Sequence, residues 1–234
     1  FENPTRLPVR IWKRYPQIEP RWEIAHTFPE GCINHVHNLC RGRGGRLWIL
    51  TGDFEHSAAI WLSNSEIAEP TLVLGGRQCF RGTWIRETET NDLVWATDTQ
   101  LEPNHVHRAR WLRGEWLVEN IASIEGSCIY WQHHPDGVLF SSTVEPGAPT
   151  GHRLADLFCR SRGPGILSND AVLYYYSESK GLIEISRGTK DGWPSRLAQF
   201  GCFILPEGTG PQSTVVFSGQ ALSRSEEHTS ELQS

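Results

Sequence analysis

A short pattern that recurs at a constant interval limits the possible folds of this chain most strongly. An apolar run, a threonine and then an acidic residue occur in three segments: RLWILTGD (46–53), LVWATDT (93–99) and VLFSSTVEP (138–146). The threonines of successive segments lie 46 residues apart, at Thr51, Thr97 and Thr143. A period of this length is typical of four-stranded propeller blades. We therefore predict an all-β fold, a β-propeller of four-stranded antiparallel blades.

Strand-forming runs fit this period along the chain. Runs rich in Trp, Val, Ile, Leu and Thr alternate with Gly, Pro and Asn turns, and helical periodicity is nearly absent. Four runs fall in each period and predict three complete blades, over residues 33–76, 81–123 and 128–188. Further pairs of runs at 9–28 and 201–222 predict two half-blades. An insertion at roughly residues 147–170 interrupts the third blade.

Length and composition suit a single β domain. The chain has 234 residues, of which 38% are hydrophobic, enough to bury a sizeable core. We assign residues 1–223 to one β-propeller domain and expect it to be truncated at both ends, since the chain begins with Phe1 and contains no Met. The segment RSEEHTSELQS (224–234) reads as the translation of a sequencing adapter and is predicted to be a non-native tail.

Charge and hydropathy exclude several partners. A formal net charge of −5 argues against nucleic acid as a partner, because such binding needs a basic surface. No run of 18 apolar residues occurs, so we predict no membrane insertion. The six cysteines have no CxxC spacing, which argues against a zinc ribbon and for free thiols. Nothing in the sequence assigns a compartment.

Several segments together point to a known group of proteins. They are HVHNL (35–39), LWILTGDFEHSAAIWLSN (47–64), WATDT (95–99), STVEP (142–146) and FGCFILPEG (200–208). In this combination the chain resembles the sialidase-like, BNR-repeat group of bacterial propeller proteins of uncharacterised activity, over about residues 9–222. The resemblance implies a carbohydrate-active propeller. The Asp-box turn of such proteins is degenerate here, because Ser179 replaces its aspartate, and the sialidase arginine triad has no counterpart that can be placed.

Acidic residues follow the second strand of each predicted blade. In a propeller these strand ends surround the central channel, where loops form the functional face. Glycoside hydrolysis needs paired carboxylates, one as the acid and one as the nucleophile or base. The candidate catalytic residues are therefore Asp53, Asp98 and Glu145. A structural role stays open, because acids after a strand often cap turns.

Histidines and other polar residues are predicted on the same face. Each His-x-His pair places two imidazoles on one side of a strand, because side chains alternate. The candidate substrate-binding residues are His35, His37, His56, Arg81, Gln100, Asn104, His105 and His107. Imidazole with carboxylate suits zinc, manganese or iron, so a divalent metal at the His-x-His pairs is an open alternative to hydrogen-bonded channel histidines. The sequence identifies no cofactor.

These candidates lead to one expected function and one rival. We expect the channel face to bind an oligosaccharide or polysaccharide and to cleave it. The chemistry is either hydrolysis by the carboxylates or elimination, as in a polysaccharide lyase. Elimination needs a His or Tyr base and an arginine or a metal that stabilises the enolate, for which Arg81 beside His35, His37 and His105 is suited. The alternative is a non-catalytic propeller that binds sugars or proteins, because a fold alone does not specify an activity.

Overall fold

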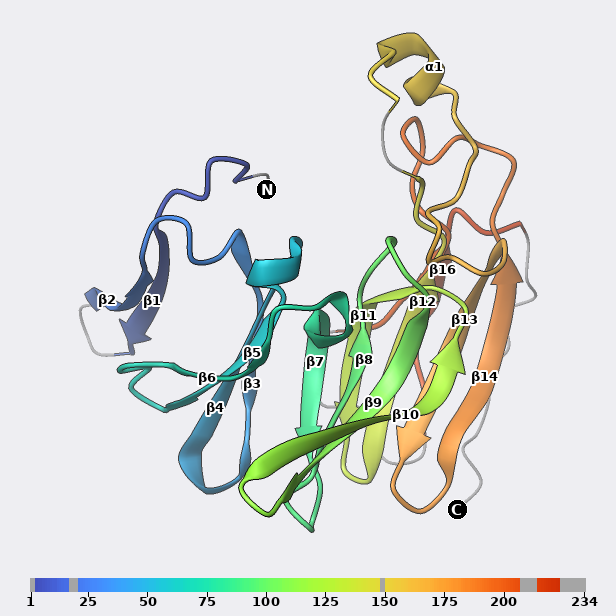
Figure 1. Cartoon of the computed structure of the whole chain (residues 1–234). Coiled ribbons are helices and arrows are strands. Elements are labelled where there is room, and N and C mark those ends of the chain that lie inside the picture. Colours follow the sequence, from blue (N-terminus) through green and yellow to red (C-terminus); the bar gives the residue numbers. More distant parts are fainter. Residues whose placement is uncertain (1–2, 17–20, 148–149, 207–213, 224–234) are drawn as a thin grey trace. The chain divides into compact units, whose positions relative to one another are not determined.

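The structure, a computed structural model, describes residues 3–16, 21–147, 150–206 and 214–223. These residues form an all-β fold whose main elements are three four-stranded sheets, each with strands in chain order (Figure 1). The first sheet contains β3 (His35–Arg41), β4 (Arg46–Gly52), β5 (Ala59–Asn64) and β6 (Thr71–Gly75). The second contains β7 (Gly82–Glu87), β8 (Leu93–Thr97), β9 (Asn104–Leu112) and β10 (Glu115–Ile124). The third contains β11 (Ser127–His134), β12 (Gly137–Thr143), β13 (Asp170–Ser177) and β14 (Gly181–Thr189).

Shorter elements complete the described chain. Two antiparallel pairs are formed by β1 (Val9–Tyr15) with β2 (Arg21–Phe28), and by β15 (Cys202–Ile204) with β16 (Ser218–Gln220). The helical turns are η1 (Arg43–Gly45), η2 (Glu55–Ser57), η3 (Gln78–Phe80) and α1 (Arg153–Leu157). The all-β prediction and the four strands assigned to each of three periods are confirmed, as are the two strand pairs flanking them. The predicted tail at 224–234 lies outside the described residues.

The chain divides into two compact units, which are described separately. The first contains residues 1–95 and 108–119, and the second contains residues 96–107 and 120–234. Five buried side chains form a core in the first unit: Ile11, Phe28, Ile33, Ile49 and Ile67. A larger cluster in the second unit includes Leu139, Val144, Leu173, Phe203 and Leu205. Each such side chain contributes about 1.5–3 kcal/mol when fully buried.

The repeated threonines have a structural explanation. All three are at most 1% exposed, and each hydroxyl is hydrogen-bonded to a segment next to its own strand. The Thr51 hydroxyl donates to the backbone oxygen of Ser57 at 2.6 Å, and the Thr97 hydroxyl accepts from the backbone N–H of His105 at 2.8 Å. The Thr143 hydroxyl donates to the backbone oxygen of Ser127 at 3.1 Å. A buried hydroxyl needs such a partner. Each threonine therefore links the end of its own strand to the adjacent segment: β4 to η2, β8 to β9 and β12 to β11.

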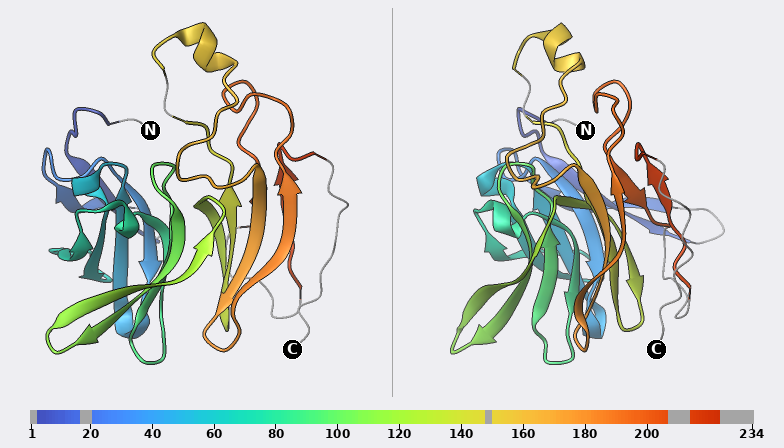
Figure 2. Two further views of the ribbon diagram at one scale, coloured as in Figure 1. Left: turned by 45° about the vertical axis from the view of Figure 1, so that its right-hand side comes forward. Right: turned by 90° about the vertical axis from the view of Figure 1, so that its right-hand side faces the viewer.

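The predicted insertion in the third sheet contains the single α-helix of the described residues. Both views of Figure 2 show the α1 segment extending past the ends of β12 and β13, in the same unit. Its loop is held by Asp156, whose carboxylate accepts hydrogen bonds from Thr150 N and Oγ1, both at 2.7 Å. Among the described residues no helix is both long and apolar enough to cross a bilayer.

Candidate functional site

In the first unit, polar side chains from three segments gather around Asp53. Asp53 directly follows β4, and its φ of 93° is unusual for a residue other than glycine. His35 and His37 lie at the start of β3, which pairs with β4 so that His35 is opposite Gly52. Arg81 directly follows η3. A left-handed backbone conformation at such a position is often part of a functional constraint.

Four donors surround the two oxygens of the Asp53 carboxylate. Oδ2 lies 3.0 Å from His35 Nδ1 and also accepts a hydrogen bond from Asn34 Nδ2. Oδ1 lies 3.1 Å from an Arg81 guanidinium nitrogen and 3.4 Å from His37 Nε2. The two imidazoles stack with ring centroids 4.6 Å apart. The prediction that this His-x-His pair shares one side of its strand is therefore confirmed.

Local backbone features shape this arrangement. The register between β3 and β4 shifts between Val36 and Asn38, a bulge at His37. Bulges re-aim side chains next to functional sites. An added Cβ on Gly52 would lie 2.5 Å from His37 Cε1 and 3.1 Å from Arg81 Cγ. Glycine is thus required here because the imidazole and the arginine pack directly over its backbone.

Burial differs across the group and separates the roles of its members. The side chains of His37 and Arg81 are only 4% and 10% exposed, whereas those of Asp53 and His35 are 27% and 35% exposed. Burial would raise the pKa of the Asp53 carboxyl, but hydrogen bonds from His35 and His37 and the Arg81 charge hold this pKa far below its ordinary value. Asp53 is therefore ionised at neutral pH, and His35 is the imidazole most open to a ligand.

The group also has the composition of a metal site. One ligand atom each from His35, His37 and Asp53 can be chosen so that all lie within 4.8 Å of one another. In the described part of the chain, no other group of three His, Cys, Asp or Glu side chains meets this condition. Zinc bonds of about 2.0–2.2 Å would fit such spacing. However, Arg81 contacts the same oxygen as His37, and its positive charge opposes a second cation there.

His56 belongs to the same unit, and its ring stacks with that of Phe54. It lies on η2 and is exposed, with its ring parallel to that of Phe54 at 6.2 Å between centroids. Arg6 lies over the other ring of this pair, 5.5 Å from the Phe54 centroid. The prediction that His56 binds substrate stays a prediction.

The second unit contains the candidates that follow β8. Asn104 is fully buried, and its amide donates to the backbone oxygens of Thr99 at 2.6 Å and Gly165 at 3.2 Å. Asn104 therefore stabilises its own loop. Gln100 is half-buried, and its backbone oxygen accepts a hydrogen bond from Gly165 N at 2.9 Å.

The remaining candidates of the second unit differ in their access to solvent. Asp98 and His107 are 5% and 3% exposed, whereas His105 is half-buried and its Nδ1 lies 3.3 Å from Ser123 Oγ. The His105 and His107 rings meet edge to face, 5.8 Å between centroids. Glu145 is half-buried and accepts a hydrogen bond from the Ser127 hydroxyl. These side chains stay candidates for ligand binding.

Two residues of the Asp53 group were absent from the sequence prediction. Asn34 is 4% exposed and binds Asp53, and its Oδ1 has no hydrogen-bond partner among the described residues. Gln78 is 1% exposed and donates from Nε2 to the Asp53 backbone oxygen at 3.0 Å. The position of Asn34 directly before a His-x-His pair could have identified it as part of this group. No sequence pattern identifies Gln78, because its contact with Asp53 depends on where η3 lies in the fold.

Comparison with protein-family models, curated proteins and solved structures finds no significant match to this chain.

Proposed function

We propose that this chain is part of a β-propeller of the sialidase-like, BNR-repeat kind, which binds an acidic polysaccharide and cleaves it by β-elimination. The 46-residue repeat and the succession of four-stranded antiparallel sheets support the propeller architecture. One observation carries the chemistry: a solvent-accessible His35 whose Nδ1 lies 3.0 Å from a carboxylate that is kept ionised by hydrogen bonds from the two histidines and by the charge of Arg81. This combination suits proton abstraction beside a sugar carboxylate.

His35 is the proposed base. When its Nδ1–H donates to Asp53 Oδ2, the lone pair of the neutral ring is on Nε2. Nε2 then removes the proton from the carbon next to the carboxylate of a uronic acid. The electron pair of that C–H bond forms a carbon–carbon double bond, and the glycosidic C–O bond at the neighbouring carbon breaks. The leaving oxygen takes a proton from water, and His35 returns the abstracted proton to the solvent, so the two fragments together equal the substrate in mass.

Asp53 and Arg81 are the proposed positioning residues. A carboxylate on the far nitrogen of a catalytic imidazole fixes its tautomer and stabilises its protonated form. Because Arg81 neutralises Asp53, the anionic substrate meets no net negative charge at the base. The guanidinium also stabilises the extra negative charge that develops as the proton leaves.

The same electrostatics disfavour Asp53 as the acid of a hydrolase. A glycosidase acid must be protonated at working pH, which requires a raised pKa. The pKa of Asp53 is shifted in the opposite direction. Of the two chemistries that the sequence leaves open, elimination is the better supported by this site.

Mass spectrometry of the products tests the proposal. The protein is incubated with oligosaccharides of uronic acids and with neutral oligosaccharides. We expect unsaturated fragments from the uronic acids only, and a loss of about 10²–10⁴-fold in rate for His35→Gln. His152→Gln, a change of an exposed histidine in the other unit, is the matched control. Fragments that gain a water would establish hydrolysis instead, and binding without products would establish the non-catalytic alternative.

A further inference from the structure

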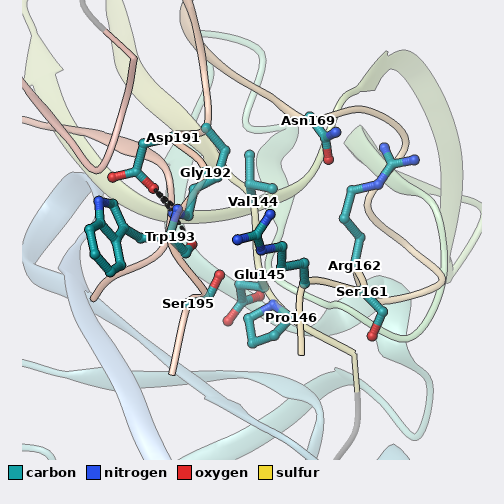
Figure 3. Close-up of a pocket in the computed structure, with 12 residues that line it drawn as sticks. Val144, Glu145, Pro146, Ser161, Arg162, Asn169, Asp191, Gly192, Trp193 and Ser195 are labelled. Carbon is teal, nitrogen blue, oxygen red and sulfur yellow. Dashed lines mark hydrogen bonds and ion pairs between the residues drawn. The ribbon is translucent and has the colours of Figure 1, made fainter. Parts of the chain in front are cut away.

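A pocket in the second unit lies between three chain segments. It is lined by the residues that follow β12, by a stretch of the insertion around 160–162, and by the loop after β14 (Figure 3). In the view of Figure 3, Trp193 and Arg162 stand on opposite sides of the hollow, with Glu145 between them. The pocket thus combines an aromatic ring, basic side chains and a carboxylate.

Trp193 presents an exposed indole on a fixed backbone. The residue is 67% exposed. Its backbone N–H donates to Asp191 Oδ1 at 3.1 Å, and its backbone oxygen accepts from Lys190 Nζ at 2.9 Å. Lys190 in turn donates its backbone N–H to Asn169 at 2.7 Å. A large exposed aromatic side chain on an anchored backbone is a ready stacking surface, because no ordering of the loop backbone has to accompany binding.

Two arginine side chains line the pocket. Arg160 and Arg162 are exposed, and within the described residues neither forms an ion pair. Lys190, by contrast, is paired with Asp191. The backbone beside the arginines is anchored, since Gly147 N donates to Ser161 O and Gly163 N donates to Glu145 O, both at 3.0 Å. The arginines are therefore available for an anion that enters the pocket.

Glu145 completes the set with an oriented acceptor. The Ser127 hydroxyl donates to its carboxylate, and the residue is half-buried at the pocket wall. A carboxylate held in this way accepts hydrogen bonds from sugar hydroxyls, while guanidinium groups bind a carboxylate in a bidentate manner. An indole supplies the apolar face on which a sugar ring stacks.

We propose that this pocket is a binding subsite for a uronic acid residue of an oligosaccharide. Trp193 stacks on the sugar ring, Arg160 and Arg162 bind its carboxylate, and Glu145 accepts hydrogen bonds from its hydroxyl groups. The subsite is a property of the second unit alone and does not rest on the proposed cleavage at His35, although both concern acidic carbohydrate.

Calorimetry with three probes tests this subsite in the His35→Gln protein, where turnover of the ligand is expected to be about 10²–10⁴-fold slower. The probes are tetragalacturonate, its methyl-esterified form and the neutral cellotetraose. We expect binding of tetragalacturonate, and at least about tenfold weaker binding after Trp193→Ala or after the double change Arg160→Gln with Arg162→Gln. The methyl ester should bind like the arginine variant, because it lacks the charge that the guanidinium groups recognise.

Two matched variants control for general effects. Trp22→Ala removes a tryptophan that is 59% exposed and has Arg14 over its ring at 5.9 Å, in the first unit. Arg153→Gln removes an exposed arginine outside the pocket. Both should bind tetragalacturonate like the parent protein. Equal binding of all three probes, or unchanged affinity of the Trp193 and arginine variants, overturns the subsite while leaving the His35 test of cleavage unaffected.

Discussion

The Asp53→Asn variant is the most informative change in the first unit, because it removes one charge and keeps the side-chain shape. The carboxylate accepts from four donors, whereas an amide has one acceptor oxygen and one NH₂ group. At least two of the four donors therefore lose their acceptor, and the ion pair between Asp53 and Arg81, whose side chain is only 10% exposed, is broken. Hydrogen bonds to charged groups contribute about 1.5–3 kcal/mol each, and breaking a buried ion pair costs about 3–5 kcal/mol.

We expect the free energy of unfolding of the variant to fall by about 2–4 kcal/mol. This is less than the sum of the lost interactions, because Asp53 itself is 27% exposed. Backbone strain should not contribute, since asparagine adopts positive φ at least as readily as aspartate. Urea unfolding followed by tryptophan fluorescence at pH 7 measures the difference. Asp136→Asn, an exposed aspartate in the other unit, is the control and should change stability by less than about 0.5 kcal/mol.

The pH dependence separates this electrostatic explanation from simple misfit. A carboxyl whose folded-state pKa is lowered stabilises the fold above its unfolded-state pKa, and that contribution disappears as the pH falls toward the folded-state pKa. The stability difference between the parent and Asp53→Asn should therefore be full at pH 7. Below about pH 4 it should shrink by about 1.4 kcal/mol per pH unit. A difference that stays constant down to pH 3, or one below about 1 kcal/mol at pH 7, refutes the reasoning.

Three further perturbations test a close contact, a buried hydrogen-bonded loop and the absence of a metal requirement. Gly52→Ala should lower the free energy of unfolding by about 1–3 kcal/mol and also lower turnover, because the added Cβ would displace His37. Gly192→Ala is the control, since its Cβ would contact no other atom. It should leave stability unchanged in the same urea titration. Asn104→Ala should cost about 2–4 kcal/mol, since two backbone oxygens lose their donor. Dialysis against a chelator should leave product formation unchanged, because Arg81 already neutralises Asp53; activity lost and then restored by zinc or manganese contradicts this.

The sheets could be predicted because their signals are local. Alternation of apolar and polar residues and the turns between runs lie within single strands, and the constant spacing of Thr51, Thr97 and Thr143 groups the strands in fours. His35 and His37 were also predictable as a pair, because strand geometry alone places alternate side chains on one side.

The remaining parts of both sites depend on contacts between distant segments. Gln78 reaches the Asp53 backbone across 25 positions, and no pattern within η3 indicates that contact. The pocket of the second unit is similar, because Arg160 and Trp193 lie in loops without periodicity. Loops carry function without a repeating pattern, so the indole and the guanidinium groups become a candidate site only once the fold brings them to one pocket.

The acidic residues after the threonines show where repeat reasoning stops. Asp53 and Glu145 come two positions after their threonines and are partly exposed, whereas Asp98 comes one position after Thr97 and is only 5% exposed. Thr99, which does lie two positions after Thr97, is fully buried, so the offset from the threonine alone does not set the exposure of these positions. The threonine hydroxyl, by contrast, is hydrogen-bonded to a neighbouring segment in all three repeats. The repeated threonine thus has the same structural role in each sheet, whereas the acidic residues that follow it differ in burial and can differ in role.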